Sequence, residues 1–383
     1  MNRVSGPNRM LSTPASSPTP DGDANRRARR VHRAASDLRR GVPVLVTGDA
    51  PLVLLAAETA GPDGIAELIS LGMAPPVLLL APVRAAAVLR RPAGQPDTPV
   101  AVRLPPALLD PNVLRGLADP TSKQTTAGMV LESAPAPALA AAALALIKLG
   151  RLLPAVLAVP ARPDLSQYDL LSVTAESVLA YPGMEAAALR LIASAPVPLN
   201  GAPDSRVVAF RGEASAFEHL AIMIGHPETA EAPLVRIHSE CFTGDLLGSM
   251  RCDCGEQLRG AIGRMAEDGA GVLLYLAQEG RGIGLINKLR AYNLQDRGLD
   301  TLDANRVLGW DADERNFLVA GAMLAALGVK RVRLLTNNPD KMAALAAHGV
   351  EVLGREAHQF APNGVNDEYL ATKAARFGHM LDE

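Results

Sequence analysis

The sequence predicts an α/β (α+β) protein of two mixed-sheet domains, each with helices packed on a central sheet. The chain has 383 residues, more than one buried core usually encloses. From residue 41 to about 200, short apolar runs of strand length alternate with Ala-rich helical stretches. From about residue 205, strand-like and helix-like segments alternate again and polar motifs become dense.

The predicted elements follow in chain order. Residues 1–40 contain many Ser, Pro, Asn and Arg without evident apolar periodicity, so we expect a disordered basic tail. The apolar runs 42–46, 52–57 and 155–159 predict buried strands, and the Pro-rich residues 195–203 predict a linker. In the second half, the runs 272–276 and 331–335 also predict strands. One helix face is also predicted in this half, formed by Leu258, Ile262, Met265 and Ala266.

Composition narrows the class of protein. Apolar residues make up 48% and charged residues 20%, which is typical of a soluble globular protein. The formal net charge of −2 and the 3% aromatic content argue against a general nucleic-acid binder. The longest apolar run, residues 137–147, is too short to span a bilayer, and no signal-peptide core is present at the N-terminus. We therefore expect a cytoplasmic protein with no nucleic-acid and no membrane partner.

All three cysteines lie close together, at Cys241, Cys252 and Cys254. An odd count excludes a full disulfide framework, and a clustered set of thiols in the cytoplasm indicates a metal. On an extended segment Cys252 and Cys254 would point to the same side, and Cys241 would return across a turn at residues 243–245. Three thiolates suit zinc.

The spacing leaves the type of zinc site open. Three ligands and an open position form the catalytic arrangement, in which the metal activates a water. A structural site would require His238 or a distant histidine as the fourth ligand, and spacing alone favours the catalytic site only slightly. Arg236, just before these ligands, offers a phosphate-binding guanidinium beside the metal.

A glycine-rich segment, residues 278–284, follows a predicted strand and opens a helix. Glycines let the backbone approach a ligand, and a helix N-terminus favours anions. Glu279 could accept hydrogen bonds from the edge of a guanine, and Arg281 could bind phosphate. Asp313 and Arg315 could act as a base and a phosphate partner. Taken singly, the glycine-rich segment is weak evidence against a plain turn, and a surface charge cluster is the favoured interpretation of residues 313–315.

A second strand-to-helix corner lies at residues 334–341. Asn338 is a natural N-cap and Pro339 a natural first helical residue. Helix capping explains both of them but leaves Lys341 unexplained, because a cation in the first turn opposes the helix dipole unless an anion binds there. Thr336 and Lys341 would flank such an anion.

Six ordered motifs carry a resemblance to GTP cyclohydrolase II, the zinc enzyme that opens the guanine ring in riboflavin synthesis. The resemblance covers about residues 235–381. The motifs are RIHSEC, GDLLGSMRCDCG, QEGRGIGLINKLRAYNLQD, DERNF, LLTNNPDK and NDEYLATKAARFGH. One departure is Ala277, where the family commonly has Arg before the QEGR run.

The resemblance implies roles for individual residues. Cys241, Cys252 and Cys254 would bind Zn²⁺. Asp313 would accept a proton, and Tyr292 would line the site. The GTP-binding residues it implies are Arg236, Ile237, His238, Ser239, Glu240, Gln257, Glu279, Gly280, Arg281, Thr301, Thr336 and Lys341.

The resemblance also implies the chemistry. Water opens the imidazole ring of GTP, formate and pyrophosphate leave, Mg²⁺ accompanies the triphosphate, and the enzyme is a homodimer. The product would be 2,5-diamino-6-ribosylamino-4(3H)-pyrimidinone 5′-phosphate. Arg315 would attack the α-phosphate as a nucleophile. Since a guanidinium stays protonated, electrostatic stabilisation of the phosphate is the alternative role.

The N-terminal half, from residue 40 to about 182, resembles a degenerate 3,4-dihydroxy-2-butanone 4-phosphate synthase. The similarity lies in the segments RGVPVLV and LGRLLPAVL, residues 40–46 and 149–157. The acidic run that this family needs for magnesium is replaced by TGDAP at residues 47–51, and residues 138–146, where its metal-binding His is expected, are only Ala and Leu. We expect an inactive domain over 41–200, which serves folding, dimerisation or regulation, and a GTP cyclohydrolase II domain over 201–383.

Two alternatives stay open at this point. The first is a paralogue of the same enzyme class that serves pyrimidine breakdown or secondary metabolism, which the inactive N-terminal half and Ala277 motivate. The second is a non-catalytic nucleotide-binding regulator. The three cysteines and the pair of Asp313 and Arg315 argue against a regulator, because a sensor needs no open metal position.

Overall fold

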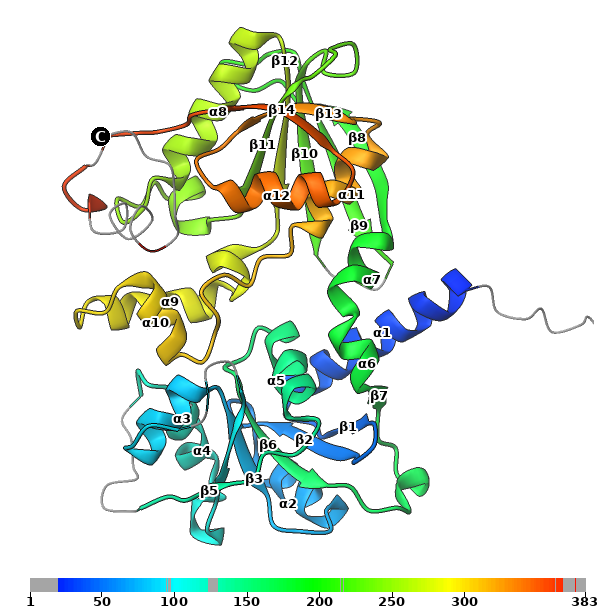
Figure 1. Cartoon of the computed structure of the whole chain (residues 1–383), viewed down its shortest axis with the longest axis vertical. Helices are drawn as coiled ribbons and strands as arrows, with labels where there is room; N and C mark the ends of the chain where they lie inside the picture. Colours follow the sequence, from blue (N-terminus) through cyan, green and yellow to red (C-terminus); the bar gives the residue numbers. More distant parts are fainter. Residues whose placement is uncertain are drawn as a thin grey trace, which may run out of the picture.

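The computed structural model describes residues 20–93, 95, 98–122, 130–213, 215, 217–361, 363–367 and 376. Its two halves each contain a seven-stranded mixed sheet with helices against it, which confirms the predicted fold class. Figure 1 shows the two sheets at opposite ends of the long axis, with α9 and α10 between them. Among the described residues, no helix is long and apolar enough to cross a lipid bilayer.

The N-terminal unit is built on the sheet β5-β4-β3-β6-β2-β1-β7, in which only β1 and β7 pair in parallel. Helices pack on both faces, and each face has its own apolar core. The strands are β1 (Val44–Thr47), β2 (Leu52–Ala56), β3 (Val77–Leu80), β4 (Val100–Arg103), β5 (Ser133–Ala134), β6 (Ala155–Pro160) and β7 (Ser172–Thr174). The α-helices are α1 (Pro20–Arg39), α2 (Pro62–Leu71), α3 (Pro82–Leu89), α4 (Pro111–Ala118), α5 (Ala140–Leu149), α6 (Ala175–Leu179) and α7 (Tyr181–Ala187).

The C-terminal unit is built on the sheet β14-β13-β11-β12-β10-β9-β8. Strands β12, β11, β13 and β14 run parallel to one another, and the remaining pairs are antiparallel. The strands are β8 (Leu189–Pro196), β9 (Ser205–Gly212), β10 (Glu218–Gly225), β11 (Leu234–Ser239), β12 (Ala270–Leu276), β13 (Arg331–Leu335) and β14 (Glu351–Glu356). The α-helices are α8 (Cys254–Asp268), α9 (Leu285–Gln295), α10 (Thr301–Val307), α11 (Leu318–Ala326) and α12 (Pro339–Ala347).

Helices cover both faces of this second sheet. The predicted apolar face of α8 packs with Leu234 and Leu273 in one core. Helices α11 and α12 contribute to the core on the other face. Helix α12 begins at Pro339, as the sequence predicted. Since β11, β12 and β13 are parallel, their carboxyl ends meet at one edge, where ligands usually bind in such sheets.

The expectation of a disordered tail over residues 1–40 is wrong for residues 20–39, which form α1. This helix buries Ala28, Val31, Ala35 and Leu38 against the first sheet. Their spacing of three and four residues is helical, but five arginines between residues 26 and 33 obscure it. Residues 1–19 lie outside the described part of the chain.

The predicted linker at residues 195–203 is also different in the structure. Strand β8 extends to Pro196 and pairs along its length with β9, and Leu199 and Ala202 bridge the turn between them. The prolines of this segment therefore end a hairpin strand. Because β8 belongs to the second sheet, that sheet begins at Leu189, twelve residues before the expected boundary at 201.

Candidate active site

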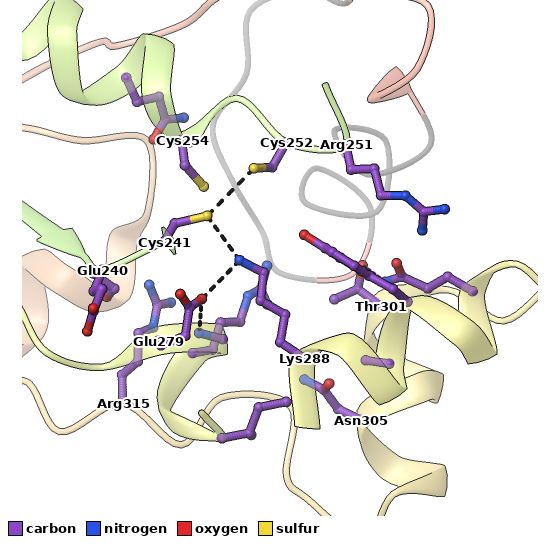
Figure 2. A pocket seen from close by; sticks show the side chains of 18 of the residues that line it. Glu240, Cys241, Arg251, Cys252, Cys254, Glu279, Lys288, Thr301, Asn305 and Arg315 are labelled. Atoms are coloured by element: carbon purple, nitrogen blue, oxygen red, sulfur yellow. Dashed lines mark hydrogen bonds and ion pairs between the residues drawn. The ribbon is translucent and has the colours of Figure 1, made fainter. Parts of the chain in front are cut away.

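A cavity of about 350 Å³ opens at the carboxyl edge of β11, β12 and β13 (Figure 2). Its wall comes from the end of β11, the start of α8, the loop after β12, and helices α9 and α10. Most of the site residues expected from the sequence meet here. They are Arg236, His238, Ser239, Glu240, Cys241, Cys252, Cys254, Gln257, Glu279, Gly280, Arg281, Tyr292, Thr301, Arg315 and Lys341.

The three cysteines form one cluster in the cavity wall. Their ligand atoms all lie within 4.8 Å of one another, and the Sγ atoms of Cys241 and Cys252 are 3.7 Å apart. All three are free thiols. Cys254 is the first residue of α8, so the expected extended geometry of residues 252–254 is wrong: the turn into the helix, and not a strand, brings the two thiols together.

A π-helical turn, Phe242–Leu246, brings the backbone against the thiols. A Cβ added at Gly244 would lie 2.9 Å from the Cys252 Sγ and 3.0 Å from the Cys241 Sγ. The amide of Gly244 donates to the Cys241 Sγ at 3.3 Å. The turn therefore forms a close-fitting cradle that only glycine permits at this position.

The donor set fits zinc. A tetrahedral ion with Zn–S bonds of about 2.3 Å separates two sulfurs by about 3.8 Å, close to the distance between the Cys241 and Cys252 thiols. Hydrogen bonds from the other two cysteines, and then the Lys288 charge, lower the pKa of Cys241. Hydrogen bonding to Cys241 in turn raises the pKa of Cys252 to about 11. The thiols thus compete for negative charge, which a divalent cation would relieve.

His238 was the alternative fourth ligand, and its ring is engaged elsewhere. Its Nε2 lies 3.1 Å from both carboxylate oxygens of Asp245. The same carboxylate accepts from the Tyr275 hydroxyl at 2.9 Å and from the Cys241 amide at 3.0 Å. Among the described residues, the ligand cluster consists of the three cysteines. This arrangement is the one expected of an open, water-activating site.

Lys288 reaches the cluster from α9 and was missed in the sequence. Its Nζ lies 3.1 Å from the Cys241 Sγ and 2.9 Å from both the Glu279 Oε1 and the Thr243 Oγ1. Although burial opposes it, the charge on Cys241 raises the pKa of Lys288. Figure 2 shows its amino group between the cysteines and Glu279. The signal available was its spacing of four residues from Tyr292, which puts both on one helix face.

The sequence suggested that the Glu279 carboxylate accepts hydrogen bonds from the edge of a guanine. In the structure both of its oxygens already accept hydrogen bonds from the protein. Its Oε2 accepts from the Phe242 amide at 2.6 Å, and its Oε1 accepts from the Gly280 amide at 2.8 Å and from Lys288. The side chain is only 4% exposed. Glu279 thus ties the loop after β12 to the π-helical turn and to α9.

Arg236 lines the cavity and is 5% exposed. Its guanidinium donates to the Leu335 carbonyl at 3.1 Å and to the Gln257 side chain. Burial lowers its pKa to about 10, so the group is still charged at neutral pH. Arg236 Nε and Ser239 Oγ are buried without a hydrogen-bond partner among the described residues. A polar ligand could satisfy both.

Asp313 and Arg315 form a bidentate ion pair. Arg315 Nε lies 2.8 Å from the Asp313 Oδ1, and the Nη2 donates to the second oxygen. Although burial opposes it, hydrogen bonds from Arg315 lower the pKa of Asp313. Arg315 lines the cavity and Asp313 does not, so this carboxylate stands behind the arginine.

Two further expected residues do not line the cavity. Ile237 is in the apolar core, and its carbonyl accepts from the Lys341 Nζ at 2.6 Å. Thr336 is 2% exposed, and its hydroxyl accepts from the Asn338 amide at 3.1 Å. Both support the wall from behind.

Other residues of the wall were not expected. Arg251 pairs with Asp296 at 2.6 Å and lies 4.9 Å from the centre of the Tyr292 ring. Asn305 lines the cavity from α10. Most of the last expected motif, NDEYLATKAARFGH, lies outside the described residues, apart from positions 366, 367 and 376.

Comparison with known proteins gives consistent results. The family model of GTP cyclohydrolase II matches residues 190–357. A GTP cyclohydrolase-2 of Azospirillum brasilense is 45% identical over 382 residues, which covers 97% of this chain and 98% of that protein. A riboflavin biosynthesis protein of Vibrio vulnificus is 52% identical over 177 residues, 46% of this chain and 48% of that protein.

Among solved structures, a two-domain 3,4-dihydroxy-2-butanone 4-phosphate synthase from A. baumannii is similar over 87% of this chain and 100% of that one. The sequence identity is 16% and the TM-score 0.33, a likeness too slight to assign the N-terminal unit. The similarity to the Azospirillum protein, by contrast, extends through nearly the whole of both chains. The chain belongs to the GTP cyclohydrolase II family of hydrolases.

Proposed function

We propose that this protein hydrolyses GTP, opens its imidazole ring and releases formate and pyrophosphate, the first step of riboflavin synthesis. The product would be 2,5-diamino-6-ribosylamino-4(3H)-pyrimidinone 5′-phosphate. One observation carries the proposal: a cluster of three thiols shares a single cavity with six cationic side chains. The family membership and the names of the relatives support the same reaction.

Cys241, Cys252 and Cys254 would hold one Zn²⁺ ion in each subunit. When bound, zinc supplies Lewis acidity that makes water nucleophilic at neutral pH. The chain keeps this end of the cavity rigid: Gly244 brings the π-helical turn against the thiols, and Asp245 fixes both His238 and the Cys241 backbone.

The triphosphate would bind along the cationic side chains of the cavity. Six cations and four carboxylates line it, so an anionic ligand improves the charge balance. Arg236, Arg281 and Lys341 are residues that the family resemblance implies for GTP binding, and Arg315 is the residue that it implies for the α-phosphate. Mg²⁺ would accompany the triphosphate and neutralise further charge.

Asp313 and Arg315 would act as a unit in this site. Since their pairing lowers the pKa of Asp313, the carboxylate is ionised at neutral pH and can orient the guanidinium. Arg315 would then stabilise negative charge on the phosphate, the role that suits a group that stays protonated. Tyr292 lines the same cavity, with its hydroxyl 3.4 Å from the Thr243 Oγ1.

The test incubates the purified full-length protein with GTP and Mg²⁺, with and without prior removal of zinc. Formate, pyrophosphate and the diaminopyrimidine should appear only with the zinc-loaded protein. Cys252→Ser should lose both bound zinc and turnover, whereas Met250→Ser, at an exposed position two residues away, should keep both. If the zinc-loaded protein leaves GTP intact, the proposal is wrong.

The family resemblance also leads us to propose a cytoplasmic homodimer that binds neither nucleic acid nor membranes. Sedimentation of the purified protein tests the oligomeric state, and a monomer at micromolar concentration would contradict it.

A further inference from the structure

We propose that the N-terminal unit is a scaffold that holds one wall of the active site in place, with Arg151 and Glu58 as its positioning residues. The wall consists of the loop after β12 and helix α9, which carry Glu279, Lys288 and Tyr292. The proposal rests on the function proposed above, since it assigns the N-terminal unit a part in that same site.

Helix α9 has two functional faces. Lys288 points toward the cysteine cluster (Figure 2), and the hydroxyl of Tyr292, four residues later, lies 3.4 Å from the Thr243 Oγ1. Asn287, Ala291 and Leu294 follow one another at helical spacing on the buried side of the helix. Ala291 and Leu294 belong to the same apolar core as the strands and helices of the N-terminal unit.

The shared core is extensive. The C-terminal unit contributes six buried apolar residues to a core that otherwise belongs to the N-terminal unit: Ile283, Ala291, Leu294, Ala304, Leu308 and Trp310. Figure 1 shows α9 and α10 between the two sheets, with α3 next to α10. The apolar side of this active-site wall is therefore buried against the N-terminal unit.

Arg290 fixes the orientation of α9. Its guanidinium donates to the Glu58 Oε1 at 2.8 Å, the Asp119 Oδ2 at 3.0 Å and the Asn287 Oδ1 at 2.8 Å. Glu58 and Asp119 both belong to the N-terminal unit, and all three side chains of the two ion pairs are less than one-fifth exposed. Because the guanidinium is planar and binds three oxygens, it fixes the orientation of α9 relative to the N-terminal unit as well as the distance between them.

Glu58 connects this contact to Arg151. Its second oxygen, Oε2, accepts from the Leu153 amide at 2.7 Å, two residues after Arg151. One carboxylate thus holds both α9 and the chain segment that follows α5. Glu58→Gln would keep the size of the side chain but would remove the charge that faces Arg290.

Arg151 contacts the loop and the helix at once. Its Nη2 donates to the Ala277 carbonyl at 2.7 Å, directly before Gln278 and Glu279, and its own carbonyl accepts from the Asn287 amide group at 3.0 Å. The loop packs tightly here, since a Cβ at Gly284 would lie 3.1 Å from the Arg151 Cδ.

The backbone of Arg151 is held in the left-handed region, with φ +54°. Such a conformation is uncommon for a residue with a side chain and persists where surrounding contacts determine it. Its guanidinium lies 3.9 Å from the centre of the Phe217 ring in the C-terminal unit. The residue is thus held by contacts to both units.

The experiment compares Arg151→Ala and Glu58→Gln with the control Arg90→Ala. Arg90 belongs to the N-terminal unit, has the same φ of +54° and is exposed, so it matches Arg151 in type and backbone conformation. Hydrogen exchange is measured by mass spectrometry on the zinc-loaded full chain, together with kcat and KM for GTP.

We expect exchange in residues 278–296 to accelerate at least tenfold in Arg151→Ala and Glu58→Gln, while both sheets stay protected. The kcat should fall about tenfold to a hundredfold, since small misplacements of active-site groups have effects of this size. KM should change less than kcat, because Arg236 and Lys341 project from elements outside this wall, whereas Arg281 alone of the four proposed triphosphate-binding cations lies in it. Arg151→Lys should restore part of kcat, since it can still donate one hydrogen bond.

The proposal is overturned if Arg151→Ala and Glu58→Gln match Arg90→Ala in both exchange and kcat. If the wild-type protein does not turn over GTP, the proposed function fails, but the exchange measurement still tests the scaffold. If Arg151→Ala does not fold, Glu58→Gln, which removes no side-chain volume, decides the question.

Discussion

Replacement of Gly244 by alanine tests whether the π-helical turn is a cradle for a metal. The new Cβ would lie 2.9 Å from both the Cys252 Sγ and the Cys254 Cβ, and 3.0 Å from the Cys241 Sγ. Real Cβ atoms almost never approach heavy atoms so closely, so the turn or the thiols must move. Overpacking of this kind costs about 1–3 kcal/mol. If the cost falls on the metal-bound form, zinc affinity drops about 5-fold to 150-fold.

The assay is the zinc content of the protein after equilibration with a series of buffered free zinc concentrations. A matched control is Gly263→Ala in the same region, because an added Cβ at Gly263 in α8 meets nothing within 4 Å. That control should bind zinc as the wild type does and should be slightly more stable, since alanine is the better helix former. A Gly244→Ala protein that binds zinc with wild-type affinity would refute the view that the turn is shaped around the ion.

Three further predictions concern the arginine pair, acid stability and the N-terminal unit. Arg315→Lys keeps the charge but cannot contact both Asp313 oxygens in the same way, so kcat/KM for GTP should fall about tenfold to a hundredfold. An unchanged kcat/KM would contradict the proposed role of the paired guanidinium. Burial lowers the pKa of His219 to about 4 from 6.5, so the unfolded chain binds a proton below pH 6.5 and the folded chain does not. Stability should therefore fall by about 3 kcal/mol between pH 6.5 and 4, and urea unfolding of His219→Asn should show a weaker pH dependence than the wild type. The N-terminal unit should form no dihydroxybutanone phosphate from ribulose 5-phosphate, and any such product would refute its inactivity.

Much of the fold could be predicted from the sequence, because local periodicity carries it. The apolar runs at 52–57 and 155–159 became β2 and β6, the two strands at the centre of the first sheet. The apolar face of α8 could be predicted from the helical spacing of its apolar residues between Leu258 and Met265. Helix α1 was missed because its apolar residues are separated by arginines that remain in solvent. The many arginines made the helical spacing of the apolar residues hard to recognise.

The cysteine cluster was predictable for a different reason. Its three residues lie within fourteen positions of one another, and cysteine is the rarest of the site's residue types. Lys288 was not predictable in this way, since its contact with Cys241 depends on how α9 lies over the β11 end. The hydrogen bond from the Phe242 amide to Glu279 likewise depends on tertiary structure, and no local sequence pattern predicts it.

The departure at Ala277 illustrates how the two units depend on each other. The sequence has Ala277 where the family commonly has an arginine before the QEGR run, so the C-terminal unit supplies no cation at this position. In the structure a guanidinium is present beside this position, but it comes from Arg151, 126 residues earlier, and binds the Ala277 carbonyl. The small side chain at 277 lies in the space between the two units together with Arg151 and Phe217. Ala277 is a loss of charge only when the C-terminal unit is considered by itself, because in the whole chain this position belongs to the interface between the two units.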